Sequence, residues 1–238
     1  MAASTVMVVP TYNERENIEL LLDGLLGFDI PGLSILVVDD QSPDGTAEIA
    51  AKFREKDARV HVLVREGPRG RGVAGIDGFR HALAMGADWV GEMDGDLSHR
   101  PEDLPSLLAA CEEADIVVGS RYVEGGKVIG WGWYRHVNSR LSNAMARWLL
   151  GIHLRDTTSG YRLFHRRVLE GVPWDQFIST GPTIVEELLV YTLAPDVRTV
   201  EVPITFVDRV RGNSKLDLTL LFKCFWTLLG IRARKART

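Results

Sequence analysis

Carboxylate side chains follow two predicted strands at points where they could bind a metal ion. Asp39 and Asp40 come directly after one apolar run, and Asp94, Gly95 and Asp96 come after another. Two aspartates one residue apart, on a loop kept narrow by a glycine, can both face a divalent cation. Carboxylate oxygens suit Mg²⁺ or Mn²⁺, which keep other positions for water and phosphate. The pattern also fits a solvated acidic turn, but its place at the end of a predicted central strand favours a metal site.

A second candidate site is the glycine-rich segment 70–75, which matches the GxGxxG pattern of dinucleotide-binding folds. That pattern requires a tight turn from strand to helix, whereas residues 65–69 separate the preceding strand from Gly70. We therefore interpret these glycines as a flexible loop, on which Arg69 and Arg71 lie either near phosphate or exposed to solvent. A nicotinamide-dependent oxidoreductase remains the alternative from a different enzyme class.

Other catalytic patterns are absent from the sequence. It contains no GxSxG elbow, no Cys/His nucleophile pattern, no Walker A segment and no histidine spacing typical of a metal centre. Cys111 and Cys224 lie far apart, as is typical of reduced thiols. The sequence therefore gives no support to a serine or cysteine hydrolase or to a P-loop ATPase.

Alternating strands and helices are expected to hold the carboxylates along one edge of a sheet. The predicted strands of the first half are 6–9, 34–38, 60–64, 89–93 and 116–118, and the predicted helices are 14–26, 45–56, 73–85 and 101–113. This order predicts an α/β fold with a mostly parallel central sheet flanked by helices, in a single domain. Ligands bind such sheets at the carboxyl ends of the strands.

The pattern is less regular beyond Ser120. A glycine-rich loop is predicted at 125–132, followed by a helix at 135–150, a strand at 160–165, a helix at 183–194 and a strand at 197–207. We expect this half to build a second side of the same site and not a separate domain.

Six motifs, taken together and in order, resemble the family 2 glycosyltransferases, and among them the polyprenol-phosphate (dolichol-phosphate) mannosyltransferases. The motifs are VVPTYNE at 8–14, VVDDQSPDGT at 37–46, MDGDLSH at 93–99, GSRY at 119–122, TSGYR at 158–162 and FVDRVRGNSK at 206–215. The second and the last are the most specific to this branch. The resemblance covers nearly the whole chain and implies a Rossmann-like fold of the GT-A type.

The resemblance also implies which residues bind each ligand. The nucleotide sugar is implied to contact Pro10, Tyr12, Glu14, Val38, Asp40, Asp94, Gly95, Asp96, Arg209 and Lys215. The acceptor phosphate is implied to contact Arg121, Arg135 and Ser139, and the metal, Mg²⁺ or Mn²⁺, to contact Asp94, Asp96 and Ser98. The residues implied to be catalytic are Asp94, Asp96, Arg121 and Arg135.

The implied reaction is an inverting transfer of mannose from GDP-mannose to a polyprenyl (dolichyl-type) monophosphate. A phosphate monoester has a second pKa near ~6, so it is mostly dianionic at neutral pH and needs no general base. One departure bears on the sugar: Val185 stands where many relatives carry glutamine, although Glu187 keeps the nearby acid. Glucosyl transfer from UDP-glucose is therefore the alternative within the same enzyme class.

Charge is unevenly distributed along the 238 residues, which are 45% hydrophobic, 25% charged and carry a net charge of −4. This composition is typical of a globular domain, and no apolar run is long enough to cross a bilayer. From Glu201 onward the chain has eight basic residues and three acidic ones, which suggests an anionic partner such as phosphate, a membrane surface or nucleic acid.

Two segments are expected from these patterns: a catalytic domain at 1–216 and an amphipathic, basic helix at 217–238. The helix either packs back onto the domain or lies at a membrane interface. Because the implied acceptor is a lipid, we expect a cytoplasmic protein attached peripherally to the cytoplasmic face of the membrane, without a nucleic-acid partner. A separate membrane-anchoring subunit is a further partner to consider.

Overall fold

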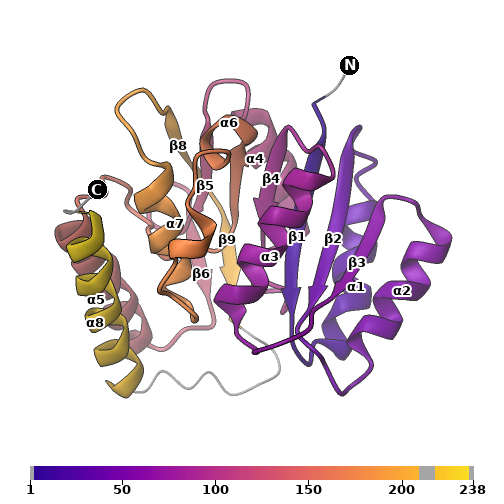
Figure 1. The fold of residues 1–238 in the computed structure, drawn as a ribbon, viewed down its shortest axis with the longest axis horizontal. Helices are drawn as coiled ribbons and strands as arrows, with labels where there is room; N and C mark the ends of the chain where they lie inside the picture. The colour runs from indigo at the N-terminus through magenta and orange to yellow at the C-terminus, as the bar shows by residue number, and fades with distance from the viewer. Residues whose placement is uncertain (1–2, 209–217, 236–238) are drawn as a thin grey trace.

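The centre of the molecule is a seven-stranded sheet with the strand order β3-β2-β1-β4-β7-β5-β8 (Figure 1). It is seen in a computed structural model that describes residues 3–208 and 218–235. The strands are β1 (Thr5–Thr11), β2 (Leu33–Asp39), β3 (Val60–Val64), β4 (Trp89–Glu92), β5 (Ile116–Ser120), β7 (Arg162–His165) and β8 (Thr199–Pro203). Strand β7 runs antiparallel to β4 and β5, and the other neighbouring strands pair in parallel. The predicted mostly parallel α/β sheet is confirmed.

Helices cover both faces of this sheet (Figure 1). They are α1 (Arg15–Leu26), α2 (Thr46–Lys56), α3 (Arg71–Ala84), α4 (Leu104–Ala110), α5 (Trp133–Leu150), α6 (Arg166–Leu169), α7 (Ile184–Thr192) and α8 (Leu218–Lys235). Side chains alternate along a strand, so β1 places Val6 and Val8 in one core cluster and Met7 and Val9 in another. The first cluster includes side chains of α3, α5 and α7, and the second includes side chains of α1, α2 and α4.

Two predicted elements differ from the structure because their backbone pairing is set by distant residues. The predicted loop at 125–132 contains a short strand, β6 (Lys127–Ile129), which pairs with β9 (Thr205–Val207). The single strand predicted at 197–207 is divided into β8 and β9. The division falls at Ile204, whose N–H donates to the carbonyl of Ser120. Pro203, the last residue of β8, has no N–H with which to extend the ladder.

The prediction of a flexible loop for the glycines of 70–75 is wrong. Gly72 and Gly75 lie buried in the first turns of α3, and Gly70 is the residue that precedes the helix. A Cβ atom on Gly72 would lie 3.0 Å from the carbonyl oxygen of Gly181, so the absence of a side chain allows α3 to approach the segment around Gly181. These glycines therefore serve close packing of a helix.

The described part of α8 packs against the domain. Leu228 and Ile231 are buried in the first core cluster, whereas Trp226 is exposed. An interfacial role for the segment 217–238 remains a prediction. Among the residues that the structure describes, no helix has the length and apolar character needed to cross a membrane.

Candidate active site

The loops after β1, β2 and β4 meet at the carboxyl edge of the sheet around a cavity of about 430 Å³, cavity 1. Residues from all three loops line it, because parallel neighbours end at the same edge. Those that the sequence predicted are Pro10, Tyr12, Glu14, Asp40, Asp94, Gly95 and Asp96; Arg69, Gly70 and Arg71 join them from the segment before and at the start of α3. The structure thus brings together most of the predicted nucleotide-sugar residues.

The three loops share an unusual backbone conformation. Asn13, Gln41 and Leu97 have φ angles of 59°, 63° and 63°, in the left-handed region that residues other than glycine rarely adopt. Such conformations cost about 1–3 kcal/mol each and cluster at functional sites. They turn the chain sharply just after the strands, which keeps the flanking side chains at the edge of cavity 1.

Asp40 holds the start of α3 in place beneath cavity 1. Its carboxylate accepts hydrogen bonds from Arg65 and, at 2.7 Å, from the backbone N–H of Gly70. On the rim, Tyr12 is 44% exposed, and its hydroxyl accepts a hydrogen bond of 2.7 Å from Arg69. The Arg69 guanidinium also lies over the Tyr12 ring, which presents an aromatic surface to a planar ligand.

Asp94 and Asp96 lie on the same loop but have different surroundings. The Asp94 carboxylate is 2.6 Å from the Arg71 guanidinium, whereas Asp96 accepts a hydrogen bond of 3.0 Å from the N–H of Ser98. Another Arg71 nitrogen lies 3.7 Å from the buried carboxylate of Glu92, whose pKa burial raises. A positive charge therefore already lies beside Asp94, among acidic groups.

His99 supports this loop from below. Its Nδ1 accepts a hydrogen bond of 3.0 Å from the N–H of Asp94, and its ring packs against Tyr161 and Phe206. Burial lowers the pKa of His99, so the ring is neutral at physiological pH and can serve as this acceptor. Because the acceptor nitrogen is already used, His99 acts as a support for the Asp94 backbone.

A second cavity of about 350 Å³, cavity 2, meets the first at Asp94, which lines both. The predicted acceptor residues line it together: Arg121 directly follows β5, and Arg135 and Ser139 come from α5. The other polar side chains around it include His99, Trp131 and Glu186, and apolar ones come from Phe206 and Leu228. Burial raises the pKa of Glu186 to about 7.

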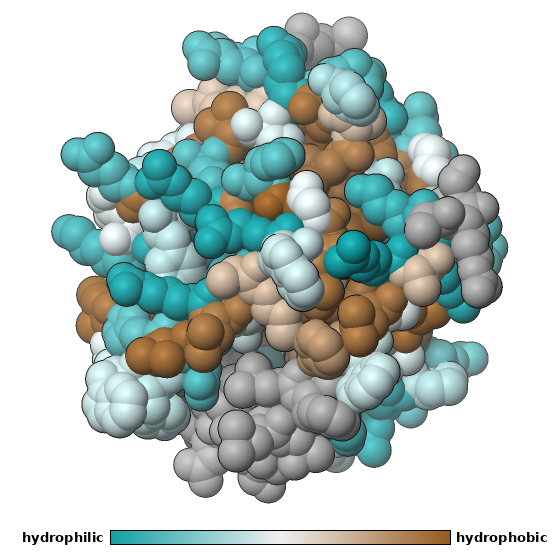
Figure 2. Space-filling model, turned by 90° about the vertical axis from the view of Figure 1, so that its left-hand side faces the viewer, coloured by the Kyte–Doolittle hydropathy of each residue, from teal (hydrophilic) through white to brown (hydrophobic). Residues whose placement is uncertain are grey.

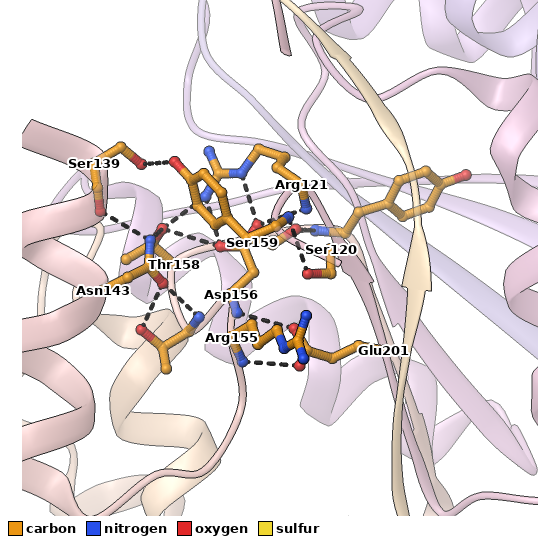
Figure 3. A network of polar contacts seen from close by, with 12 residues as sticks. Ser120, Arg121, Ser139, Asn143, Arg155, Asp156, Thr158, Ser159 and Glu201 are labelled. Atoms are coloured by element: carbon orange, nitrogen blue, oxygen red, sulfur yellow. Dashed lines mark hydrogen bonds and ion pairs between the residues drawn. The ribbon is translucent and has the colours of Figure 1, made fainter. Parts of the chain in front are cut away.

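Arg121 is anchored in a polar network that joins β5, α5 and the segment before β7 (Figure 3). Its guanidinium donates to both carboxylate oxygens of Asp156, at 2.8 and 2.7 Å, and to the hydroxyl of Thr158. Burial alone would raise the pKa of Asp156, but Arg121 outweighs it and lowers that pKa. On α5, Asn143 donates to the same Thr158 hydroxyl. Most of the charge on Arg121 is thus compensated within the protein.

Arg135 has donor capacity that its neighbours do not use. One of its terminal nitrogens lies 2.5 Å from Asp208, and its guanidinium lies 4.6 Å from the ring centre of Trp131. Its Nε and the Nε1 of Trp131 are both buried without a hydrogen-bond partner in the described part of the chain. Two such donors at the wall of cavity 2 are suited to an anionic ligand.

Two predicted residues are not brought to either cavity, and two others lie outside the part of the chain that the structure describes. The Val38 side chain is fully buried in the core, and Ser98, 1% exposed, is not among the residues that line the cavities. Arg209 and Lys215 lie outside the described residues. A contact of any of these four with a ligand remains a prediction.

Sequence reasoning missed the buried polar residues that support cavity 2. Arg162 is 1% exposed and donates only to backbone carbonyls, those of Thr157, Ser159 and Val185. Glu187 accepts hydrogen bonds from the N–H groups of Ile178 and Ser179, so this acid holds a loop. The TSGYR motif gave a signal for Arg162, whose partners Thr157 and Ser159 lie nearby in sequence, whereas Val185 comes from the distant helix α7.

Comparison with known proteins shows which family this chain belongs to. The model of the family "Glycosyl transferase family 2" matches residues 6–172, which include the strands and loops of cavity 1. The chain belongs to glycosyl transferase family 2. It is thus a glycosyltransferase, as the resemblance of its motifs predicted.

Two curated relatives of this family 2 enzyme match over most of their length. A polyprenol monophosphomannose synthase of Mycolicibacterium smegmatis is 41% identical over 237 residues, 98% of this chain and 89% of the relative. An undecaprenyl-phosphate mannosyltransferase of Micrococcus luteus is 44% identical over 210 residues, 88% of this chain and 86% of the relative.

Solved structures share the fold of the family 2 enzyme. Glucosyl-3-phosphoglycerate synthase from Mycobacterium tuberculosis, solved with Mn²⁺, UDP and its product, has a TM-score of 0.67 at 22% identity, covering 98% of this chain and 80% of that one. The same protein with Mg²⁺ and UDP has a TM-score of 0.68 at 22% identity, with the same coverage. At this identity the likeness concerns the GT-A fold alone, and it confirms the predicted fold.

Proposed function

We propose that this family 2 enzyme transfers mannose from GDP-mannose to a polyprenyl monophosphate. The observation that carries the proposal is the meeting at Asp94 of a cavity rich in carboxylates and a second cavity, where Arg135 and Trp131 have buried donors without a partner in the described residues. The names of the two curated relatives, which are mannosyl-transferring enzymes acting on polyprenyl phosphates, support the sugar and the acceptor.

The donor side is proposed to bind the nucleotide diphosphate through a divalent cation, Mg²⁺ or Mn²⁺. Asp94 and Asp96 are hard oxygen ligands on one loop, and Arg71 shows that the Asp94 carboxylate already accommodates a cation at 2.6 Å. No cluster of three or more metal-binding side chains occurs in the described residues, which fits an ion that takes its remaining ligands from water and phosphate. When bound, such an ion neutralises charge on the leaving diphosphate.

The nucleoside is proposed to lie against Tyr12, with Glu14 as a hydrogen-bond acceptor. Asp40 is already bonded to Arg65 and to the N–H of Gly70, so we assign it a positioning role. It fixes the turn that carries Arg69 and Arg71 into cavity 1.

The acceptor phosphate is proposed to bind in cavity 2, where Arg135 and Trp131 offer buried donors without partners in the described region. One phosphate oxygen forms a bond to mannose C1 while the bond from C1 to the GDP oxygen breaks, and GDP leaves with the electron pair. Attack from the side opposite GDP inverts the anomeric carbon. The dianionic phosphate needs no base, so the residues contribute binding, orientation and charge compensation.

A lipid acceptor also implies work at a membrane surface. We therefore propose peripheral association with the cytoplasmic face of the membrane. The donor GDP-mannose is dissolved in water, whereas the polyprenyl chain of the acceptor lies in the bilayer, so the enzyme must work where the two meet. Whether a separate anchoring subunit takes part is a question for affinity purification from membranes.

Product analysis tests the proposal. The purified chain is incubated with labelled GDP-mannose, Mg²⁺ or Mn²⁺ and a short polyprenyl phosphate, with UDP-glucose in a parallel reaction. We expect lipid-linked mannose of inverted configuration by NMR, lost on chelation of the metal. The Asp96→Asn variant is expected to lose at least about 100-fold in kcat/KM. Its control is Asp175→Asn, at an exposed residue that lines neither cavity. Lipid labelled mainly from UDP-glucose would replace the donor, and no labelled lipid from either donor would overturn the proposal.

A further inference from the structure

The outward face of α5 exposes large apolar side chains along most of its length. Trp133 is 79% exposed, Tyr134 56%, Leu141 62% and Trp148 76%. Three of them, Tyr134, Leu141 and Trp148, are spaced by seven residues and therefore lie in one stripe. Figure 2, seen from the side of α5 and α8, shows apolar side chains at the surface among hydrophilic ones. A monomeric protein rarely exposes such a patch without a partner.

Next to this stripe lies a hollow of about 620 Å³ that three arginines line. Arg140 and Arg147 come from α5, and Arg155 comes from the segment that follows it. All three are exposed, and none forms an ion pair with an acidic side chain in the part of the chain that the structure describes. Neither α5 nor the neighbouring α8 contains an acidic residue. The hollow therefore gathers three guanidinium groups without an ion pair in the described residues, and the Glu201 carboxylate accepts a hydrogen bond from the backbone N–H of Arg155.

We propose that the outer face of α5 seats on an anionic bilayer, and that the hollow between Arg140, Arg147 and Arg155 takes the phosphate of an anionic phospholipid headgroup. Tryptophan and tyrosine favour the bilayer interface, where an apolar ring and a polar edge are both satisfied. Guanidinium groups match phosphate oxygens in a planar, paired geometry. A helix with both features on one face has the character of an interfacial helix.

A bilayer suits this surface better than the other candidates. A second copy of the chain, packed face to face, would bring the three arginines against the same three arginines. A nucleic acid or an acidic protein would satisfy the arginines but would leave Leu141 and Trp148 against a charged surface. Of these candidates, only a bilayer offers both anionic headgroups for the arginines and, just beneath them, an apolar layer for Leu141 and Trp148.

The docking helix is also a wall of cavity 2. Asn138, Ser139, Ser142 and Met145 of α5 line that cavity, while the exposed Leu141 and Trp148 are not among its lining residues and lie on another face of the helix. This link to catalysis rests on the proposed function; the docking itself does not. Docking through α5 would bring the acceptor cavity to the depth of lipid phosphates.

Vesicle binding by the full chain, without donor or polyprenyl phosphate, tests the inference separately from the proposed function. Sedimentation is measured with phosphatidylcholine vesicles that contain or lack phosphatidylglycerol. We expect binding only with phosphatidylglycerol, and a loss of roughly 10- to 30-fold in affinity for the double variant Arg140→Gln/Arg147→Gln. The matched control, Lys52→Gln/Arg54→Gln, removes the same charge from α2 on the other side of the molecule (Figure 1).

The apolar stripe has its own variant and control. Trp148→Gln is expected to weaken binding about tenfold, whereas Leu20→Gln, an exposed apolar residue on α1, leaves it unchanged. Quenching of the wild-type tryptophan fluorescence by brominated lipids gives a readout that needs no variant. The inference is overturned if the α5 and α2 variants bind vesicles equally, or if brominated lipids do not quench the tryptophan fluorescence. It is also overturned if heparin, a soluble polyanion, fully displaces the protein from vesicles and Trp148→Gln has no effect on vesicle binding.

Discussion

Arg71 gives the Asp94 carboxylate a cationic partner before any ligand binds. The pair is 2.6 Å apart at the junction of the two cavities, and Arg71 is 30% exposed, so it has room to move. A metal ion that binds Asp94 must therefore compete with a guanidinium or displace it. Under the proposed function, Arg71 would therefore tune how strongly Asp94 binds the divalent cation.

Replacing Arg71 by methionine is expected to tighten Mn²⁺ binding several-fold, because a competing positive charge beside Asp94 is removed. Electron paramagnetic resonance of free Mn²⁺ measures this binding directly. The control is Arg69→Met, which removes the same charge from the rim, where Arg69 contacts Tyr12 and not Asp94. An equal effect of both substitutions would show that only the overall charge of the cavity matters.

Glu186 gives the folded chain a predicted pH dependence. Burial raises its pKa from 4.5 to about 7, so the folded state holds a proton that the unfolded state has released between these two values. The stability of the wild type therefore falls as pH rises from about 4.5 to about 7, relative to a Glu186→Gln variant. We expect the variant to be more stable than the wild type by up to roughly 3 kcal/mol at pH 8 and to gain little at pH 4.5.

Urea denaturation of both proteins at the two pH values provides the measurement. Because other titrating groups are common to both chains, the difference between them isolates Glu186. A stability difference independent of pH would contradict the raised pKa.

Close packing of α3 against the sheet depends on Gly78. A Cβ atom on Gly78 would lie 3.0 Å from a methyl group of Val38 and closer still to Val8. We expect Gly78→Ala to lower the free energy of unfolding by about 1–3 kcal/mol, despite the better helix propensity of alanine. Gly171→Ala is the matched control, because a Cβ there meets nothing within 4 Å, and chemical denaturation should show little change for it.

Local sequence patterns predicted those strands and helices that short apolar or amphipathic segments are sufficient to specify. The apolar run at 60–64 is β3 in the structure, and the amphipathic segment at 14–26 is α1 within one residue. Strand β6 was missed because its hydrogen-bond partner, β9, lies almost eighty residues further along the chain. No local window contains that information.

The site shows the same division between local and distant information. The sequence predicted the pairing of Asp94 and Asp96 on one loop, and it predicted that the motif residues group at one edge of the sheet. The partners that set their chemistry were not, since Asp94 pairs with Arg71 and Arg121 with Asp156, far away in sequence. The left-handed backbone at Leu97 was equally invisible, because leucine gives no signal for that conformation.

The proposed function assigns donor and acceptor to two adjoining cavities, which predicts separable kinetic effects. Tyr12→Ala is expected to raise the KM for GDP-mannose by up to about tenfold while leaving the KM for polyprenyl phosphate unchanged. Arg135→Lys keeps the charge but loses the planar fork, and should raise the acceptor KM by about tenfold with the donor KM unchanged. Initial rates with each substrate varied in turn measure both constants, and a parallel rise of both in either variant would contradict the division.

The order of the sheet has a consequence for building new enzymes. The chain up to Ser98 supplies β1 to β4 and cavity 1, and the later chain supplies β5, β7, β8 and most of cavity 2 (Figure 1). Among the described strands of the main sheet, only β4 and β7 hydrogen-bond across this boundary. A gene fusion that joins the first 98 residues to the later part of another family 2 enzyme would thus retain cavity 1, the proposed donor side, and exchange most of cavity 2, the proposed acceptor side. Under the proposed function, chimaeras joined at Ser98 are expected to move the same sugar onto a different lipid.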